Sequence, residues 1–252
     1  MSLSSRTWIV LPAYNAEVTL EDTVKDIPVE YRRQLLLVDD YSTDGTVDVA
    51  ESLGLEVIRH TENRGYGANQ KTCYRAALQR GANYIVMLHP DNQYDARMVP
   101  VMVEILALGN CDLVLGNRIR SRKEALRGGM PRWKYFANRF STFTENFILG
   151  QGLGDFHSGM RAYSAEVLET LPFIRNSDDF TFDQELLVEA VSAGFTIGDV
   201  PVPVRYMDEA SSISFRRSLH YAFGGLSVVL AFLLHRWRLR RDPRFELVPA
   251  RN

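Results

Sequence analysis

The chain has 252 residues, of which 46% are hydrophobic and 24% are charged, and its formal net charge at pH 7 is -2. This composition excludes a disordered tail, and a chain of this length can bury a sizeable core within one large domain. The two cysteines give neither a disulfide framework nor metal-ligand spacing, which favours a reducing compartment.

The charge is distributed unevenly along the chain. From Arg205 onward nine Lys and Arg residues stand against four Asp and Glu residues, whereas the preceding part is net acidic. The start of the chain, "MSLSSRTWIVLPAYN", has no basic segment followed by a long apolar one, so it lacks the pattern of a secretion signal. We therefore expect a cytoplasmic protein with a cationic C-terminal tail and no nucleic-acid partner.

The first half of the sequence alternates between two kinds of segment. Short, uniformly apolar runs bounded by turn residues predict buried strands at 8–11, 35–38, 55–58, 84–88 and 113–115. Segments with helical spacing lie between them or directly after them, at 18–26, 45–53, 68–80 and 98–108. This alternation predicts a doubly wound α/β domain with a mostly parallel sheet.

The alternation of predicted strands and helices ends after Gly116. A basic stretch, "GNRIRSRKEALRGGMPRW", precedes a long helical pattern at 133–149, and a second helix is predicted at 182–193. The segment "IGDVPVPVRY" reads as a strand interrupted by prolines, which places it near a sheet edge. We divide the chain at 1–115, 116–218 and 219–252, with the first two parts as halves of one domain.

Acidic side chains follow two of the predicted strands directly. Asp39 and Asp40 end the second strand, and Asp91 follows the fourth. Ligands of open α/β sheets bind beyond the carboxyl ends of the strands, so these carboxylates should share one rim. Mg or Mn bound to one or two carboxylates and to phosphates would balance their charge, which indicates a nucleoside diphosphate ligand. Asp39 could instead serve a turn, and Ser42 or Thr43 is better explained as the N-cap of the next helix.

The stretch "NRGYGANQK", residues 63–71, has two glycines at the start of a predicted helix. Glycines there either let backbone N–H groups approach a phosphate or satisfy a loop with positive φ. The stretch is not G-x-G-x-x-G, and no such motif follows the first strand, which argues against a Rossmann dehydrogenase.

Several blocks of the sequence resemble those of family-two glycosyltransferases, which have the GT-A fold. They are "VLPAYNAEVTLEDTV", "LLLVDDYSTDGT", "NRGYGANQKTCYRAAL" and "HPDNQYDARMVP". Later blocks, "LGNR", "DFHSGMRAYSAEVL", "FDQELLVEAVSAGFTIGDVPVPVRY" and "SSIS", resemble the branch that contains dolichol-phosphate mannose synthase and related polyprenyl-phosphate glycosyltransferases. The resemblance extends from about residue 8 to residue 214.

The resemblance implies roles for individual residues. The residues expected to hold the nucleotide of the donor are Pro12, Tyr14, Asn15, Asp39 and Asp40. Asp91 is the expected metal ligand, and Gln93, beside it at the diphosphate, is counted with the metal site. Those expected to line the sugar pocket are Asp155, Gly159 and Arg161, and those expected to face an acceptor phosphate are Arg118, Arg205, Ser211 and Ser212. Residues 1–115 would then bind the nucleotide sugar, and residues 116–218 would bind the acceptor.

One position departs from the family pattern. The family usually carries an acid two positions before Asp91, where this chain has His89. Imidazole can ligate Mn, so His89 is either a softer metal ligand or a residue that orients Asp91.

The implied activity is metal-dependent, inverting transfer of a hexose from a GDP- or UDP-sugar to a polyprenyl phosphate. A phosphate acceptor needs arginines more than a general base, and the sequence after residue 115 is rich in arginine. Two alternatives stay open: a saccharide or other hydroxyl acceptor, or a catalytically weak module that binds a nucleotide sugar. For a hydroxyl acceptor, Asp183 and Glu185 are the candidate bases, unless they are exposed acids of a helix's first turn.

The last segment contains an uncharged run at 221–234 that is followed at once by "HRWRLRRDPR". At 14 residues this run is short of the roughly 20 needed to span a bilayer. Three explanations remain: a helix in the membrane interface with its basic tail on anionic headgroups, a core helix, or a contact in a homo-oligomer.

Overall fold

The computed structural model describes residues 2–119, 121–127, 130–205 and 215–246, with only the backbone for 215–223. In this part of the chain seven strands form one sheet of order β3-β2-β1-β4-β6-β5-β7. The strands are β1 Thr7–Ala13, β2 Leu35–Asp39, β3 Glu56–Arg59, β4 Tyr84–Met87, β5 Leu113–Asn117, β6 Arg161–Ser164 and β7 Ile197–Pro201. Strand β6 is antiparallel to both of its neighbours, and the other pairs are parallel.

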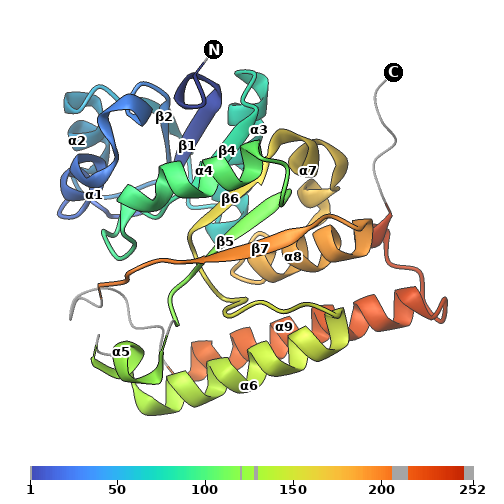
Figure 1. Cartoon of the computed structure of the whole chain (residues 1–252). Coiled ribbons are helices and arrows are strands. Elements are labelled where there is room, and N and C mark those ends of the chain that lie inside the picture. The colour runs from blue at the N-terminus through green and yellow to red at the C-terminus, as the bar shows by residue number, and fades with distance from the viewer. Residues whose placement is uncertain (1, 120, 128–129, 206–214, 247–252) are drawn as a thin grey trace.

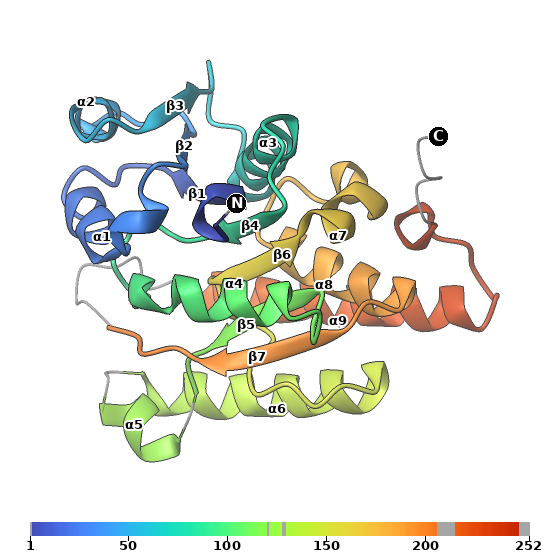
Figure 2. The same ribbon diagram turned by 45° about the horizontal axis from the view of Figure 1, so that its top comes forward.

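Helices cover both faces of the sheet (Figures 1 and 2). Among the described residues they are α1 Leu20–Asp26, α2 Thr46–Ser52, α3 Tyr66–Gln79, α4 Val99–Ala107, α5 Arg122–Arg127, α6 Arg132–Leu149, α7 Ala165–Thr170, α8 Phe182–Ala193 and α9 Phe215–Arg236. One core cluster joins the sheet to α3, α7 and α8 and extends to α6 and α9, which pack on the outside of these helices. The other joins the opposite face to α1, α2 and α4. The predicted doubly wound α/β class is thus confirmed.

The alternating side chains of the central strands explain the two cores. In β1, Val10 belongs to one cluster while Ile9 and Leu11 belong to the other. A strand directs successive side chains to opposite faces, so a strand that is apolar throughout requires cover on both faces.

Every predicted strand and helix of the first half lies within two residues of an observed element, as do the helices predicted at 133–149 and 182–193. Two predictions about strands were incomplete or wrong. Strand β6 was not predicted, because its sequence, "RAYS", is short and begins with a charged residue. Strand β3 was predicted to be buried, but it forms one edge of the sheet and is partly exposed. Strand β7 forms the other edge, as its prolines predicted.

The two predicted halves share this single sheet, since β6 and β7 pair with β4 and β5. Helix α9 contains the apolar run at 221–234 and packs against both α6 and α8. Helices α6 and α9 lie side by side along one side of the molecule (Figure 1). Over the described residues, no helix has the length and apolar character needed to cross a bilayer.

Helix α8 buries acidic residues against the segment that follows α9. Glu185 Oε1 accepts a hydrogen bond from Arg244 Nη1 (2.6 Å), and Arg244 lies within a short 3-10 helix, Pro243–Phe245. One turn further along α8, Glu189 is 1% exposed. Burial raises the pKa of Glu189 to about 9, and the nearby Glu185 carboxylate contributes to the rise.

The raised pKa of Glu189 makes the free energy of unfolding depend on pH. Between pH 4.5 and about pH 9, Glu189 is protonated in the folded chain and ionised in the unfolded chain. The free energy of unfolding should therefore fall as the pH rises through this range. The slope is at most about 1.4 kcal/mol per pH unit. Glu189→Gln should therefore raise the stability at alkaline pH and flatten its pH dependence in chemical unfolding experiments.

The matched control is Glu51→Gln, which changes an exposed acid of α2. It should leave the pH profile unchanged. A Glu189→Gln profile identical to that of the wild type would contradict the buried, protonated carboxyl.

Candidate active site

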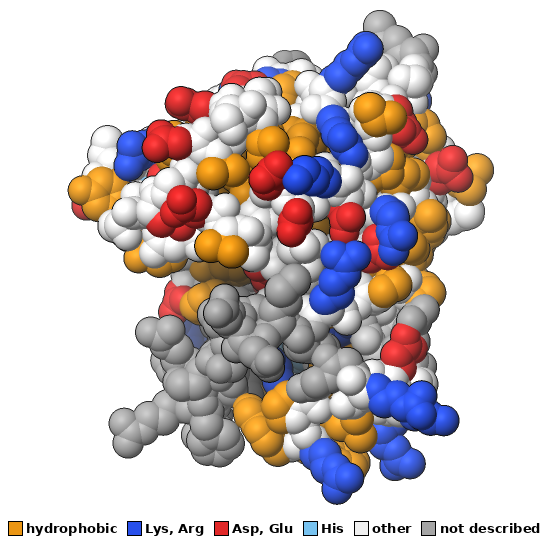
Figure 3. Space-filling view, turned by 90° about the vertical axis from the view of Figure 1, so that its left-hand side faces the viewer, with side chains coloured by type: hydrophobic (Ala, Val, Ile, Leu, Met, Phe, Trp, Pro, Cys, Tyr) orange, Lys and Arg blue, Asp and Glu red, His pale blue; other side chains and the backbone are white. Residues whose placement is uncertain are grey.

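The carboxyl ends of β1, β2, β4, β5 and β7 open at one edge of the sheet, because these strands run in the same direction. Figure 3 views the molecule from this side and shows acidic and basic side chains mixed over its upper half. All of the predicted site residues that the structure describes lie in or near the loops at this edge or in the strands that lead to them. Ser211 and Ser212 lie outside the described residues.

The loops after β1 and β2 are joined by hydrogen bonds. The backbone N–H of Asn15 donates to Ser42 Oγ (2.9 Å), and the N–H of Thr43 donates to Asn15 Oδ1 (2.9 Å). Asn15 has a positive φ of 51°, which brings its side chain across to the second loop. The N-cap prediction for Ser42 or Thr43 was wrong, since α2 begins at Thr46, whose N–H donates to Asp44 Oδ1 (3.1 Å). Pro12 is buried in β1, and Tyr14 is 55% exposed beside these joined loops.

The two acids that end β2 are satisfied from within the protein. Asp39 is fully buried, accepts a hydrogen bond from the N–H of Ser42 (3.1 Å) and lies 3.5 Å from Arg59 Nε. Asp40 accepts from the N–H groups of Arg64 and Gly65, each at 2.9 Å. His60 Nδ1 is 2.7 Å from the same carboxylate. A rim of three carboxylates that needs an external cation is therefore not what forms here. The turn explanation of Asp39 is confirmed, and contacts of Asp39 and Asp40 with a nucleotide stay a prediction.

The glycines of "NRGYGANQK" serve the loop conformation and packing. Gly65 has a φ of 94°, which a residue with a side chain rarely adopts. The N–H of Gly67 donates to the carbonyl oxygen of Asp178 (2.8 Å), and a Cβ on Gly67 would lie 2.4 Å from the carbonyl oxygen of Ser177. The N–H groups of Gly65 and Gly67 are both engaged within the protein, so the structure favours the loop explanation over a phosphate cradle.

The loop after β4 carries His89, Asp91 and Gln93. Asp91 is half-buried, and its Oδ1 accepts a hydrogen bond from the N–H of Gln93 (3.1 Å). His89 is half-buried, and its Nε2 is 3.1 Å from the hydroxyl oxygen of Tyr66. Within the described part of the chain, no three His, Cys, Asp or Glu side chains gather into a metal-holding group. One carboxylate and an imidazole two positions away are too few ligands to fill the coordination shell of a divalent cation. They suit a cation that is also coordinated by phosphate oxygens.

The chain of the second half meets this loop directly. Tyr94 forms an antiparallel bridge with Val204, and the N–H of Arg205 donates to the carbonyl oxygen of Gln93 (2.8 Å). Arg205 Nη1 donates to Asn92 Oδ1 (3.2 Å) and to Asp26 Oδ2 (3.0 Å), while half of its side chain stays exposed. The structure thus places Arg205 beside the Asp91 loop.

Arg118 is held in place by a buried acid. Its Nε donates to Asp155 Oδ2 (2.7 Å), and Asp155 Oδ1 accepts from Asn138 Nδ2 (3.0 Å). Asp155 is fully buried, which by itself raises its pKa, but Arg118, His157 and the Asn138 hydrogen bond outweigh burial and leave the pKa below its usual value. Asp155 therefore has no exposed surface in this structure and contacts Arg118 directly.

The predicted sugar-pocket residues Gly159 and Arg161 have internal contacts. The N–H of Gly159 donates to the Tyr94 hydroxyl (2.7 Å). Arg161 is fully buried, and its guanidinium donates to the carbonyl oxygens of Ser158 (2.9 Å) and Asp183 (2.8 Å), among others. Contact between Arg161 and a sugar is therefore not supported by this structure.

The two candidate bases of α8 are buried as well, so the alternative that they are exposed acids of a first turn does not hold. Asp183 accepts from the Tyr66 hydroxyl (2.8 Å) and Gln70 Nε2 (3.0 Å). Glu185, besides its ion pair with Arg244, accepts from the N–H of Ser177 (2.6 Å).

Two tyrosines at the site were not predicted. Tyr66 links His89 to Asp183, and Tyr94 fixes the backbone of Gly159. Tyr66 stands between the glycines of "RGYGA", and Tyr94 follows Gln93, so proximity to motifs was the available signal. Their partners are distant in sequence, which is why no spacing rule identifies them.

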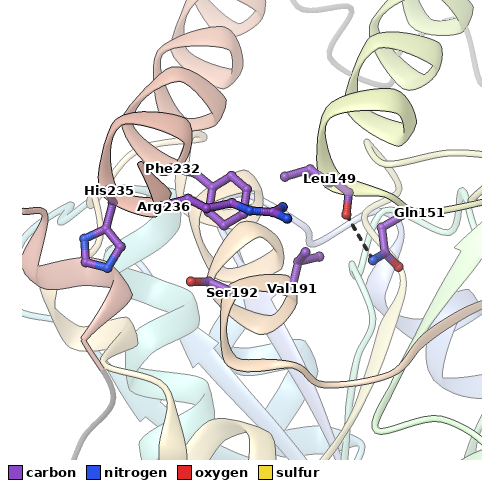
Figure 4. A pocket seen from close by; sticks show the side chains of 7 residues that line it. All are labelled: Leu149, Gln151, Val191, Ser192, Phe232, His235 and Arg236. Atoms are coloured by element: carbon purple, nitrogen blue, oxygen red, sulfur yellow. Dashed lines mark hydrogen bonds between the residues drawn. The ribbon is translucent and has the colours of Figure 1, made fainter. Parts of the chain in front are cut away.

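A cavity of about 390 Å³ lies elsewhere, between the C-terminal parts of α6, α8 and α9 (Figure 4). Its lining consists of Leu149, Gln151, Val191, Ser192, Phe232, His235 and Arg236. Because α8 leads into the amino end of β7, this cavity is at the end of the molecule opposite to the predicted site residues.

Comparisons with known proteins agree with this architecture. A family model described as Glycosyl transferase family 2 matches residues 8–171. The dolichyl-phosphate hexose transferase of Haloferax volcanii is 28% identical over 233 residues, which cover 92% of this chain and 96% of that protein. The polyprenol monophosphomannose synthase of Mycolicibacterium smegmatis is 28% identical over 211 residues, which cover 79% of this chain and 77% of that protein.

A solved structure shares the fold. Glucosyl-3-phosphoglycerate synthase from Mycobacterium tuberculosis, in complex with Mn2+, uridine diphosphate and glucosyl-3-phosphoglycerate, has a TM-score of 0.63 at 20% identity. The similarity covers 95% of this chain and 84% of that one. The expected GT-A fold is confirmed.

Replacing Asp155 should destabilise the protein, because it removes the carboxylate that pairs with Arg118 Nε and leaves a neutral side chain in its buried place. We expect Asp155→Asn to cost about 3 kcal/mol of unfolding free energy at neutral pH. The pKa of Asp155 is lower in the folded chain than in the unfolded chain, so ionised Asp155 stabilises the folded chain at pH values above the unfolded pKa. This stabilisation is lost as the pH falls through the folded pKa. The difference between the variant and the wild type should therefore shrink in acid, as measured by urea unfolding. Asp48→Asn, on the surface of α2, is the control, and an equal loss in both variants would contradict the role of Asp155.

Proposed function

Since the chain belongs to glycosyl transferase family 2, we propose that it transfers a hexose from a nucleoside diphosphate sugar to a polyprenyl phosphate with inversion at the anomeric carbon. The donor is a GDP- or UDP-sugar, and the cofactor is Mg or Mn. The relatives named as dolichyl-phosphate and polyprenol sugar transferases support the acceptor class. The Mn2+ and uridine diphosphate in the structural relative support the donor class and the cation.

The observation that carries the proposal is the state of the acids and arginines at the site. A hydroxyl acceptor needs a general base within hydrogen-bond reach. Both candidate bases are buried and engaged, Asp183 with Tyr66 and Glu185 with Arg244. A phosphate monoester has a second pKa of about 6, so it is already an ionised nucleophile at neutral pH.

The arginines suit that nucleophile. Arg205 lies beside the Asp91 loop with half of its side chain exposed, so it can reach a phosphate at the sheet edge. Arg118, held by Asp155, is the second arginine assigned to the acceptor. A guanidinium group can donate two parallel hydrogen bonds to two oxygens of one phosphate, which would orient the attacking oxygen toward the anomeric carbon.

On the donor side, Asp91 and His89 would hold the cation, with Gln93 beside the diphosphate. When bound, the cation would stabilise the negative charge that develops on the leaving nucleoside diphosphate. Tyr14 and Asn15, on the joined loops after β1 and β2, would contact the nucleoside, with Pro12, Asp39 and Asp40 supporting the same wall.

A panel of GDP- and UDP-sugars with Mg or Mn, tested against a polyprenyl phosphate and simple saccharides, checks the activity. We expect turnover with the lipid phosphate and an inverted linkage in the product. Asp91→Ala should lower the turnover by about 100-fold or more and make nucleotide binding independent of the cation. Turnover only with saccharides would replace the proposal with a hydroxyl acceptor. Binding of the nucleotide sugar without turnover on any acceptor would replace it with a binding module.

We also propose that the enzyme binds the cytoplasmic face of a membrane through α6 and α9. Five aromatic side chains of α6 are exposed by 46% to 82%, and they repeat at helical spacing as an aromatic stripe made of Trp133, Phe136, Phe140, Phe143 and Phe147. The adjacent α9 adds Leu226 and Leu230, which are 54% and 55% exposed. Such a row suits the boundary between headgroups and acyl chains.

The charges around the aromatic stripe favour a lipid surface. Glu145, the one acid of α6, is buried, and the described residues 215–236 contain no Asp or Glu. Exposed basic residues flank the two ends, as Arg122, Lys123, Arg127 and Arg132 at one and Arg236, Arg238, Arg240 and Arg241 at the other. Figure 3 shows hydrophobic and basic side chains next to each other at the bottom of the view, where α5 and α6 begin. Anionic headgroups complement this arrangement.

Vesicle binding tests the membrane contact. The double variant Phe140→Ser and Phe147→Ser should bind anionic vesicles at least about tenfold more weakly than the wild type, since each aromatic ring contributes buried apolar area. Val18→Ser with Leu108→Ser, which removes two other exposed side chains (85% and 73%), should bind like the wild type. Equal binding by both double variants would contradict the proposal. The proposal would also be contradicted if the wild type sedimented as a dimer and the Phe140→Ser and Phe147→Ser variant as a monomer. The aromatic stripe would then contact a second copy of the chain.

A further inference from the structure

His89 stands two positions before Asp91 in the loop after β4, and its surroundings determine which ring nitrogen faces a ligand. Its Nε2 lies 3.1 Å from the hydroxyl oxygen of Tyr66, and that hydroxyl lies 2.8 Å from Asp183 Oδ2. The Tyr66 ring is stacked between His89 and Phe180, with centroid distances of 5.5 and 4.8 Å. Three residues from the β4 loop, α3 and α8 therefore form one hydrogen-bonded chain, His89–Tyr66–Asp183.

The direction of the hydrogen bonds in this chain follows from the partners of Asp183. The Gln70 amide donates through Nε2 to Asp183 Oδ1 (3.0 Å), and its oxygen accepts from the Tyr74 hydroxyl (2.7 Å), which defines the orientation of the amide. The guanidinium of Arg161 is 3.8 Å from Asp183 Oδ2. A carboxylate with these partners only accepts hydrogen bonds.

The proton positions on Tyr66 and His89 are then determined. A tyrosine hydroxyl has a single proton, and here it points to Asp183. The hydroxyl oxygen therefore accepts from His89, which must carry a proton on Nε2. In the neutral imidazole this leaves the lone pair on Nδ1.

Packing holds the ring in the matching orientation. A Cβ added to Gly159 would lie 2.7 Å from His89 Cδ2 and 2.9 Å from Nε2, so the backbone there is pressed against that side of the ring. The Tyr94 hydroxyl fixes this backbone by accepting from the N–H of Gly159. Nδ1 is the ring atom opposite the Cδ2–Nε2 bond, and no hydrogen bond from a described residue occupies it.

We propose that Asp183 and Tyr66 are positioning residues that keep the proton of His89 on Nε2 and present the lone pair of Nδ1, in the loop that also carries Asp91, as a ligand for the divalent cation. The inference rests on the proposed function for the presence of a cation at this loop. A histidine that binds a metal through one nitrogen commonly donates the other N–H to a neighbouring acceptor, which orients the ring and raises its basicity. Here a tyrosine that is itself bonded to a buried carboxylate is that acceptor.

The choice of ligand also bears on which cation is preferred. Mg strongly favours oxygen ligands, whereas imidazole is better tolerated by the transition metals. The wild type should therefore favour Mn over Mg more than a His89→Asp variant does. This comparison uses cation binding alone and needs no sugar donor or acceptor.

The first test is nitrogen-15 NMR of the cation-free protein at a pH above the ordinary imidazole pKa of about 6.5. The His89 signals, identified by their loss in His89→Asp, should show a proton on Nε2 and none on Nδ1. In Tyr66→Phe, which keeps the stacked ring and removes the hydroxyl, the two tautomers should mix. A wild-type spectrum with the proton on Nδ1 would overturn the proposal, whatever the enzyme transfers.

The second test is titration with Mn2+ followed by electron paramagnetic resonance, without nucleotide sugar or acceptor. Tyr66→Phe should bind Mn2+ about 10- to 100-fold more weakly than the wild type. Tyr84→Phe, at the opposite end of β4, is the matched control and should bind normally. Equal affinity in Tyr66→Phe and Tyr84→Phe, or a Mn2+ preference unchanged in His89→Asp, would overturn the proposal. Failure of the proposed sugar transfer would be seen separately, in the donor and acceptor panel.

Discussion

A buried arginine fixes the start of α8 to the central sheet. Arg161 begins β6, is fully buried, and donates to backbone carbonyl oxygens of its own loop and of Asp183 at the start of α8. Burying a guanidinium costs several kcal/mol unless its donors are satisfied. The first turn of α8 therefore has little freedom to move relative to the central sheet. Because β6 lies between β4 and β5, the contacts of Arg161 connect the start of α8 to the interior of the sheet.

The geometry of the candidate site follows from that anchor. The carbonyl of Asp183 binds the arginine, and its carboxylate binds Tyr66 and Gln70 of α3. Tyr66 in turn contacts His89 in the loop after β4. A loop that would bind a charged ligand is thus supported by groups on two helices and a strand. Such support keeps a polar site in place before the ligand arrives, which is the condition for electrostatic stabilisation of a developing charge.

The acids at the sheet edge divide into two groups. Asp39, Asp40 and Asp155 are buried and are satisfied by arginines or backbone N–H groups of the protein itself. Asp91 is half-buried and makes a local contact with its own loop. A cation at this edge would therefore balance one carboxylate and the diphosphate, whereas the other acids set the shape of the loops. At the same edge, Arg205 is half exposed and pairs with Asp26 and Asn92.

The sequence by itself determined the fold class, most of the strands and helices and the loops in which the site lies. Apolar periodicity reports burial on one or both faces, and parallel strands bring the ends of distant segments to one edge. It also singled out His89 as a departure from the family pattern. Only the tertiary structure decided what each polar side chain does there. Asp183, Tyr66 and His89 come from three segments, and a hydrogen bond between residues more than a hundred positions apart, as between Tyr66 and Asp183, leaves no mark in local spacing. The burial of Arg161 and the short strand β6 were likewise decided by packing, because a charged residue can be buried only where partners from elsewhere in the chain satisfy it.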